Sequence, residues 1–278
     1  GAVNGRLAEV RGGARQTSMS FGELSDQFNR YSGIITAGVA ILVGFGVSAK
    51  AIIDRNNEMA DAMTAVEKTT GLARSEVEEL ARTFSDFDTR TSKVDLFKIA
   101  EEGGRLGVAK SEIKDFTQEV DKAYVALGDS WKGTVEDLAN SLGKTAKLFA
   151  ETKDLPIATA INQIGSALNE LAASGASSEQ NISDFVLRMG RVPEALRPPL
   201  NTLLGYGSAF EELGINAEIG SSGFSKFIRV AAGNVEGFAK VMNQPIEKVR
   251  ELINTNPAEF FLQFSEGLKG LDGDEIAN

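Results

Sequence analysis

Apolar side chains recur at every third or fourth residue along most of this chain of 278 residues. That spacing places them on one face of a helix with 3.6 residues per turn. One such stripe consists of Ile157, Ile161, Ile164, Leu168 and Leu171, and a second of Ile113, Phe116, Val120, Ala123 and Leu127. No convincing alternation of apolar and polar residues between turn signals predicts a strand. The sequence therefore predicts an all-α fold.

Start signals for helices are spread along the chain. The spacing of a capping box, in which two residues three positions apart satisfy each other's free amides, occurs at Ser75/Glu78, Ser92/Asp95 and Thr134/Asp137. A cap followed by a first-turn proline occurs at Asn256-Pro257, with Glu259 close behind. Gly-containing joints such as "EEGGRLG" and "GINAEIGSSG" are expected to separate the helices. No apolar heptad is sustained, and no internal repeat of fixed period is visible.

An uncharged run leads into the helical part of the chain. No charge occurs from residue 31 to residue 49, and Arg30 and Lys50 bracket the run. A bilayer core takes about 20 apolar residues, so the length is borderline, and glycine and hydroxyl residues lower its hydropathy. Burial against protein is the favoured interpretation, and membrane contact is the alternative. The candidates for close packing or membrane contact are Gly33, Gly38, Ala40, Gly44 and Gly46.

Composition divides the chain into three parts. Residues 1–31 are small, polar and rich in glycine, and they are predicted to form an arm that is flexible or ordered by a partner. Residues 32–53 are predicted to form a Gly/Ala-rich apolar helix. Residues 54–278 are predicted to form a core domain of many short helices joined by turns that contain glycine or proline.

The residue composition limits the chemistry open to this chain, and an enzyme would have to use carboxylates, lysine, tyrosine or backbone amides. The chain holds 39 acidic and 29 basic residues, a net charge of −10, with no block of Lys or Arg, and this opposes stable nucleic-acid binding. It contains no histidine and no cysteine, which rules out Ser-His-Asp and Cys-His catalysis and the usual zinc sites. We therefore expect no catalytic residue, no metal site, no cofactor-binding site and no cofactor.

Three polar features have structural interpretations. The paired glutamates at 78–79, 101–102 and 211–212 are expected to face solvent, because glutamate is rarely buried. The stretch "GSSGFSK" lacks the spacing of a phosphate-binding loop and is expected to join two helices. Trp131, the only tryptophan, is either a buried anchor or a contact point.

Several motifs follow one another in a characteristic order. A Gly/Ala-rich apolar helix runs into an Ala-rich helix, and Thr70-Gly71 and "SEVEEL" come next. They are followed by "DLFKIAEEGGRLGVAKSEIKDFTQEVDKAYVALG", "ISDFVLRMG", "ELGINAEIGSSGFSKFI" and "NPAEFFLQFSEGLKGL". This series, over residues 37–271, resembles the core region of tail tape measure proteins from long-tailed phages. The chain departs from that family at Pro193, Pro198 and Pro199, where the family usually has a smoother pair of helices.

The resemblance implies a structural protein of the virion, with residues 54–278 as the tape measure core domain. Such proteins are assembled in the host cytoplasm, lie in the lumen or at the tip of the tail, set its length and leave ahead of the DNA. The implied partners are other copies of the chain, tail tube proteins, tail-tip or baseplate hub proteins, and the host membrane at ejection. Short helices with many joints make this chain the compact part of such a protein rather than its long helical ruler.

Two other functions are compatible with parts of the sequence. One is a membrane-inserting channel or delivery protein that uses residues 32–53. The other is a wall-degrading enzyme, which the missing histidine, cysteine and matched carboxylate pair disfavour.

Overall fold

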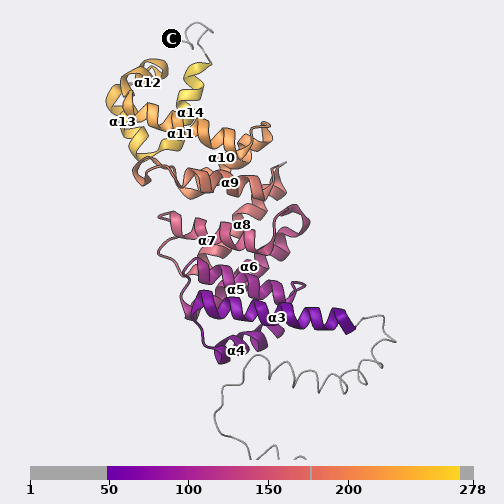
Figure 1. Ribbon diagram of the computed structural model, residues 1–278. Coiled ribbons are helices and arrows are strands. Elements are labelled where there is room, and N and C mark those ends of the chain that lie inside the picture. The colour runs from indigo at the N-terminus through magenta and orange to yellow at the C-terminus, as the bar shows by residue number, and fades with distance from the viewer. Residues whose placement is uncertain (1–48, 176, 270–278) are drawn as a thin grey trace, which may run out of the picture. The chain divides into compact units, whose positions relative to one another are not determined.

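The computed structural model describes residues 49–175 and 177–269. Within these ranges the chain forms twelve α-helices and no strand, so the predicted all-α fold is confirmed (Figure 1). The α-helices are α3 (Ala49–Thr70), α4 (Arg74–Ser85), α5 (Lys93–Arg105), α6 (Ile113–Leu127), α7 (Val135–Leu148), α8 (Ile157–Ser174), α9 (Glu179–Met189), α10 (Leu200–Glu212), α11 (Ala217–Gly233), α12 (Val235–Met242), α13 (Ile246–Thr255) and α14 (Pro257–Leu268). Three short 3-10 helices lie in the connections: η2 (Lys110–Glu112), η3 (Gly128–Ser130) and η4 (Glu194–Leu196).

Packing divides the chain into two units, Gly1–Glu58 and Met59–Asn278. The described part of the first unit is the start of α3. The predicted arm at 1–31 and the predicted apolar helix up to residue 48 lie outside the described residues, while residues 49–53 belong to α3. No described helix combines the length and the hydropathy that crossing a bilayer requires. The division into arm, apolar helix and core domain stays a prediction.

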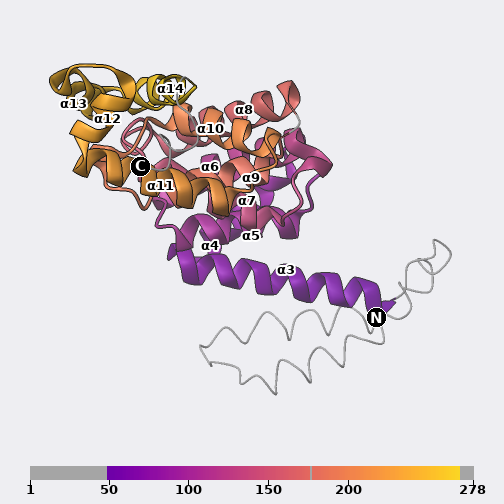
Figure 2. The same cartoon turned by 90° about the horizontal axis from the view of Figure 1, so that it is seen from above.

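In the second unit, helices α5 to α11 form two layers. In the first layer α5 packs on α7, α7 on α9 and α9 on α11, and in the second layer α6 packs on α8 and α8 on α10. Each helix also packs on its neighbour in the other layer, as α5 does on α6 and α9 on α10. Figure 1 shows the pairs in chain order, and Figure 2 shows α8 and α10 on the opposite side from α5. The substantial contacts from α5 to α11 lie within a pair or between successive pairs.

A capping side chain begins each helix of the first layer. Each cap accepts a hydrogen bond from the backbone N–H three residues on, and the caps are Ser92, Thr134, Ser178 and Asn216. They stand roughly 40 residues apart, the length of a helix-pair repeat in solenoid proteins. The residues four positions after the first three caps are all buried: Leu96, Leu138 and Ile182. The repeat varies in length and keeps only caps and buried positions, so the sequence shows no fixed period.

Three of the predicted helix starts are confirmed. Thr134 and Asp137 form a complete capping box at α7. The Ser92 hydroxyl accepts from the backbone N–H of Asp95 at 3.1 Å, which begins α5. At α14 the side chain of Asn256 caps the helix and the following proline stands in its first turn, as the sequence predicts.

The box predicted at Ser75 and Glu78 is wrong. Helix α4 begins at Arg74, one residue before the predicted cap, and Ala73 takes the capping position. Glu76 makes this start possible, because its Oε2 accepts from the backbone N–H of Ala73 at 2.6 Å. An alanine cap has no side-chain acceptor, so no sequence signal marks it.

The predicted glycine joints are only partly correct. Turns do form at Gly107 and Gly214, where φ is 71° and 76°, a conformation that favours glycine. Gly103 and Gly104 instead lie inside α5, and both glycines of "GSSG" lie inside α11. The missing side chain at Gly103 allows α5 to pack closely against α6, since a Cβ there would stand 2.8 Å from Cδ1 of Phe116.

The three prolines that depart from the resembled family lie between helices. Pro193 precedes η4, and Pro198 and Pro199 precede α10, with Pro199 at its capping position. No α-helix therefore loses an interior hydrogen bond to them. Their effect is confined to the connection between α9 and α10, which also includes η4.

The core consists of two hydrophobic clusters. The larger one runs from α3 to α11, and both predicted stripes face it. The smaller one, which we call the C-terminal cluster, joins α11 to α12, α13 and α14 through Ala231, Phe238, Ala239, Met242, Val249, Ile253 and Phe260. Phe227 of α11 packs against both clusters. Its ring centroid lies 5.5 Å from that of Phe238 and 5.4 Å from that of Phe260, so this one side chain links the two cores.

Candidate interaction surfaces

No metal-binding constellation forms in the part of the chain that the structure describes. No three acidic side chains there are placed to hold a metal ion. The candidates for close packing or membrane contact, Gly33, Gly38, Ala40, Gly44 and Gly46, lie outside the described residues. The features that remain are buried polar links, shallow grooves and the charged surfaces of the helices.

The first two glutamate pairs have different environments. Glu78 and Glu79 are exposed, as predicted. For Glu102 the prediction is wrong, since its side chain lies in the interior and the residue is only 6% exposed. Its carboxylate accepts hydrogen bonds from the side-chain amide of Asn140 on α7 and, at 3.5 Å, from Arg105. These donors stabilise a carboxylate that burial alone would disfavour.

The third pair, Glu211 and Glu212, is also only half predicted. Glu212 is exposed, but Glu211 is half-buried. Its two carboxylate oxygens accept from the backbone N–H of Ser178 at 2.8 Å and from the Ser178 hydroxyl at 2.9 Å. An acid on α10 therefore binds the residue that begins α9, where negative charge is favourable. Glu211 therefore links α10 to the start of α9.

Glu179, a further glutamate that is buried, was not singled out from the sequence. Glu179, the first residue of α9, is 4% exposed. Its Oε1 accepts from the Ser130 hydroxyl at 2.7 Å, while Oε2 has no hydrogen-bond partner among the described residues. The start of a helix stabilises its negative charge. Glu179 therefore ties the α6–α7 connection to α9, across 49 residues of sequence.

The two remaining polar features are structural. Trp131 is 6% exposed and its indole N–H donates to the backbone oxygen of Thr134 at 3.3 Å, which confirms the buried-anchor interpretation. The "GSSGFSK" stretch is interior to α11 rather than a joint. Its backbone amides are therefore used within the helix and cannot hold an anion as a loop would.

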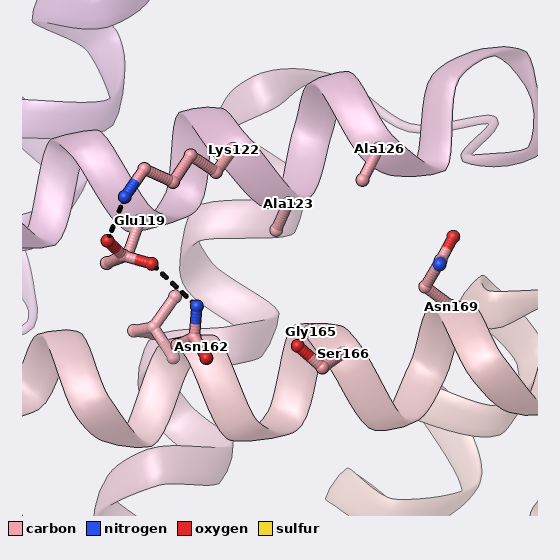
Figure 3. A pocket seen from close by; sticks show the side chains of 9 residues that line it. Glu119, Lys122, Ala123, Ala126, Asn162, Gly165, Ser166 and Asn169 are labelled. Atoms are coloured by element: carbon pink, nitrogen blue, oxygen red, sulfur yellow. Dashed lines mark hydrogen bonds and ion pairs between the residues drawn. The ribbon is translucent and has the colours of Figure 1, made fainter.

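A groove runs between α6 and α8 (Figure 3). Its volume is about 150 Å³, and small residues bring the two helices close together. A Cβ at Gly165 would lie 3.1 Å from Cβ of Ala123. On its rim Glu119 binds Lys122 at 2.6 Å and the side-chain amide of Asn162 at 2.9 Å. The rim charges already have partners, and the groove offers no reactive group.

A wider depression lies between α8 and the start of α10. It holds about 640 Å³, and its apolar lining includes Ile164, Ala167 and Leu204. Glu151 borders it and accepts from the backbone N–H of Leu200 at 3.1 Å, so the carboxylate serves as a cap for α10. The depression can receive an apolar side chain of another protein, but it holds no pair of groups for catalysis.

The ionisation of the Tyr206 phenol on α10 depends on how α10 packs against α14. Burial, together with the negative charge of Glu259, raises the pKa of its phenol from 10.0 to about 12. The folded state thus keeps this proton at a pH where the unfolded chain releases it. We expect the free energy of unfolding to fall as the pH rises from about 10 to 12, and the Tyr206→Phe variant to lose that slope. Phenolate absorbance checks this, and ordinary ionisation of all three tyrosines in the folded protein would contradict it.

Comparison with known proteins places the chain in a family. The family model described as phage-related minor tail protein matches residues 78–278, which include α5 to α14. No curated protein and no solved structure matches the chain. The family match covers more than half of the sequence. The chain therefore belongs to the family of phage-related minor tail proteins, structural components of the phage tail.

Proposed function

We propose that this chain is the compact core of a tape measure protein. In this role it lies in the tail lumen or at the tail tip, takes part in setting tail length during assembly, and leaves ahead of the DNA at ejection. Its partners are other copies of the chain, the tail tube and the tail-tip or baseplate hub, and the host membrane at ejection. It forms no stable complex with nucleic acid and catalyses no reaction.

One observation carries the proposal. The series of motifs that resembles the tape measure core, over residues 37–271, coincides with the region that matches the minor tail protein family, residues 78–278. The helices are short: the longest described one has 22 residues, about 33 Å at 1.5 Å per residue. Stacked short helices suit a folded anchor, whereas a ruler needs long extended helix.

Deletion of one helix pair in the parent phage gene tests this role. Removing residues 134–177 deletes α7 and α8, the pair that packs on both α5 and α9. We expect tails to be absent or of irregular length in electron micrographs. If the segment were part of the ruler, tails would be uniformly shorter by about 65 Å.

Two results would count against the proposal. Infectious particles with tails of normal length would show that the segment is dispensable for tail assembly. Clearing of peptidoglycan by the purified chain would show an enzyme. The Gly223→Ala phage is a suitable control, because a Cβ at that exposed position meets nothing within 4 Å and tails should form normally.

The alternative function, a channel or delivery protein that inserts into the host membrane through residues 32–53, rests on the uncharged run from 31 to 49. It is compatible with a tape measure that later meets the membrane. A peptide of residues 30–55 should then partition into liposomes. A peptide that stays in the aqueous phase would remove this alternative and leave the tape measure proposal standing.

A further inference from the structure

Basic side chains recur at the same two distances from the caps of three successive helices of the first layer. They stand ten and thirteen residues after the cap of each helix (134 to 144 and 147, 178 to 188 and 191, 216 to 226 and 229). We call this set the basic ladder: Lys144 and Lys147 on α7, Arg188 on α9 with Arg191 in the turn that follows, and Lys226 and Arg229 on α11. Since the helices repeat in register, the five side chains that lie within helices are expected to face one side of the layer, and Arg191 directly follows α9.

The ladder faces solvent and is largely unpaired. Arg188 is half-buried and the other five residues are exposed. Lys147 donates to the backbone oxygen of Leu106, and none of the other five has an ion-pair partner among the described residues. Lys144, Arg188 and Arg191 line one depression of about 390 Å³. Lys226 and Arg229 line a second depression, on α11, so the ladder gathers exposed basic side chains on a chain whose net charge is −10.

Helix stabilisation does not account for the whole ladder. Cations in the last turn of a helix interact favourably with its dipole, and this explains Lys147 and Arg188. The effect falls off within one turn. Lys226 and Arg229 lie farther from the end of α11, which continues to Gly233. The helix dipole therefore does not account for these two side chains, which remain available to a partner.

Apolar residues beside the ladder favour a protein partner. Leu148 and Val230, one residue after Lys147 and Arg229, are 39% and 47% exposed. A nucleic-acid backbone offers phosphate and sugar to such a surface, and the overall negative charge of the chain repels it. Asp184 also stands in the depression on α9, opposite in sign to its neighbours. A polypeptide with acidic and apolar side chains fits this mixture better.

The chain carries a matching acidic face on α4. Glu76, Glu79 and Asp86 are exposed and have no ion-pair partner in the described part of the chain. Their spacing of three and seven residues places the two glutamates and Asp86, which directly follows α4, along one side over about 15 Å, with the exposed Arg82 beside them. The ladder spans two helix-to-helix distances, from α7 to α11, which is about 16–20 Å. The two surfaces therefore agree in length and are opposite in charge.

We propose that the acidic face of α4 in one copy of this chain binds across the basic ladder of a second copy. The proposal rests on the tape measure function, in which several copies act together. The contact is head-to-tail, because it joins two different surfaces of the same molecule, so it can repeat into a ring or a line. Salt weakens it, because most of the charges are close to solvent.

Sedimentation equilibrium of the full chain tests the contact. At about 50 mM salt we expect association that depends on protein concentration and weakens at least tenfold at about 500 mM. The Arg188→Glu/Lys226→Glu variant should associate at least tenfold more weakly than the wild type. The matched control is Lys114→Glu/Lys132→Glu, which makes the same charge change at exposed residues outside the ladder and should associate like the wild type.

Charge exchange gives the decisive measurement. The Glu79→Lys/Asp86→Lys variant should also fail to associate alone, and mixing it with Arg188→Glu/Lys226→Glu should restore association, because each supplies the surface that the other lacks. Thermal melts check that each variant is folded. A monomer at every concentration, or association that the ladder variant leaves unchanged, would overturn the proposal.

Nucleic acid is the alternative partner, and its binding to the chain is measured separately. Fluorescence anisotropy with a duplex of about 20 base pairs should show no binding that depends on the ladder. Binding to DNA that Arg188→Glu/Lys226→Glu abolishes, without effect on association, would replace our proposal. If the chain is monomeric while the helix-pair deletion still prevents tail assembly, the contact is wrong and the tape measure function stands.

Discussion

Replacing Phe227 by alanine will release the C-terminal cluster from the rest of the helices. The ring of Phe227 contacts those of Phe238, Phe260 and Phe264, with centroids 5.2–5.5 Å apart, and it also packs against the larger cluster. Truncating a buried phenylalanine costs about 3–5 kcal/mol, and because Phe227 is half-buried we expect about 3 kcal/mol. That loss concentrates in α12, α13 and the contacts of Phe227 with α14, while Phe261 of α14 still packs against Tyr206 and Phe224 at centroid distances of 5.5 and 5.1 Å.

Hydrogen exchange monitored by mass spectrometry measures this release. Amides of residues 235–268 should lose about two orders of magnitude of protection, while those of α5 to α9 keep theirs. The matched control is Phe84→Ala, which removes a ring that is 2% exposed and packs on Phe87 and Phe97. It should loosen α4 and α5 and leave residues 235–268 protected. Uniform loss of protection along the chain in both variants would show one cooperative unit instead.

Two glycine-to-alanine substitutions within helices will change stability in opposite directions. At Gly104 a Cβ would stand 2.7 Å from the hydroxyl oxygen and 2.8 Å from the carbonyl carbon of Thr69, so the backbone of α3 must move. We expect a loss of about 1–3 kcal/mol from overpacking. At Gly223 a Cβ meets nothing within 4 Å, and alanine should gain about 0.5–1 kcal/mol from its higher helix propensity.

Urea unfolding of the two variants and the wild type tests this pair. Because the chemical change is identical, helix propensity cancels in the comparison, and the difference between the two midpoints reports the contact with Thr69. Equal stabilisation by both substitutions would show that α3 does not pack against α5 at Gly104. Loss of stability in both would show that α11 is covered at Gly223.

Local patterns in the sequence predict much of the fold. The stripe from Ile157 to Leu168 is buried because helical period alone decides which side faces the core. The caps at Ser92 and Thr134 form because their partners lie three residues away. The all-α fold class, most helix starts and the buried positions follow from interactions between residues that are close in the sequence. The arm at 1–31 and the apolar residues up to 48 stay predictions.

Features that depend on distant partners could not be predicted. One donor to Glu102 is Asn140, 38 residues away, and nothing near Glu102 in the sequence predicts this contact. The sequence predicts a turn at Gly103 and Gly104, whereas both glycines lie in a helix. They allow close contact with Phe116 and Thr69, which only the fold brings near. The ladder looks like scattered Lys and Arg until the helices are aligned on their caps. No basic block is visible along the sequence, because the residues of the basic ladder recur only once per helix pair.

The near-exclusive contact between successive helix pairs also determines how the unit responds to mechanical load. A force applied to one end is transmitted through one pair at a time, so the pairs detach in sequence and the extension rises in steps. A globule with a single shared core unfolds in one step under load. This arrangement instead extends gradually and dissipates mechanical work each time a pair detaches. Its resistance to stretching is therefore set by the weakest junction between neighbours, not by the total stability of the molecule.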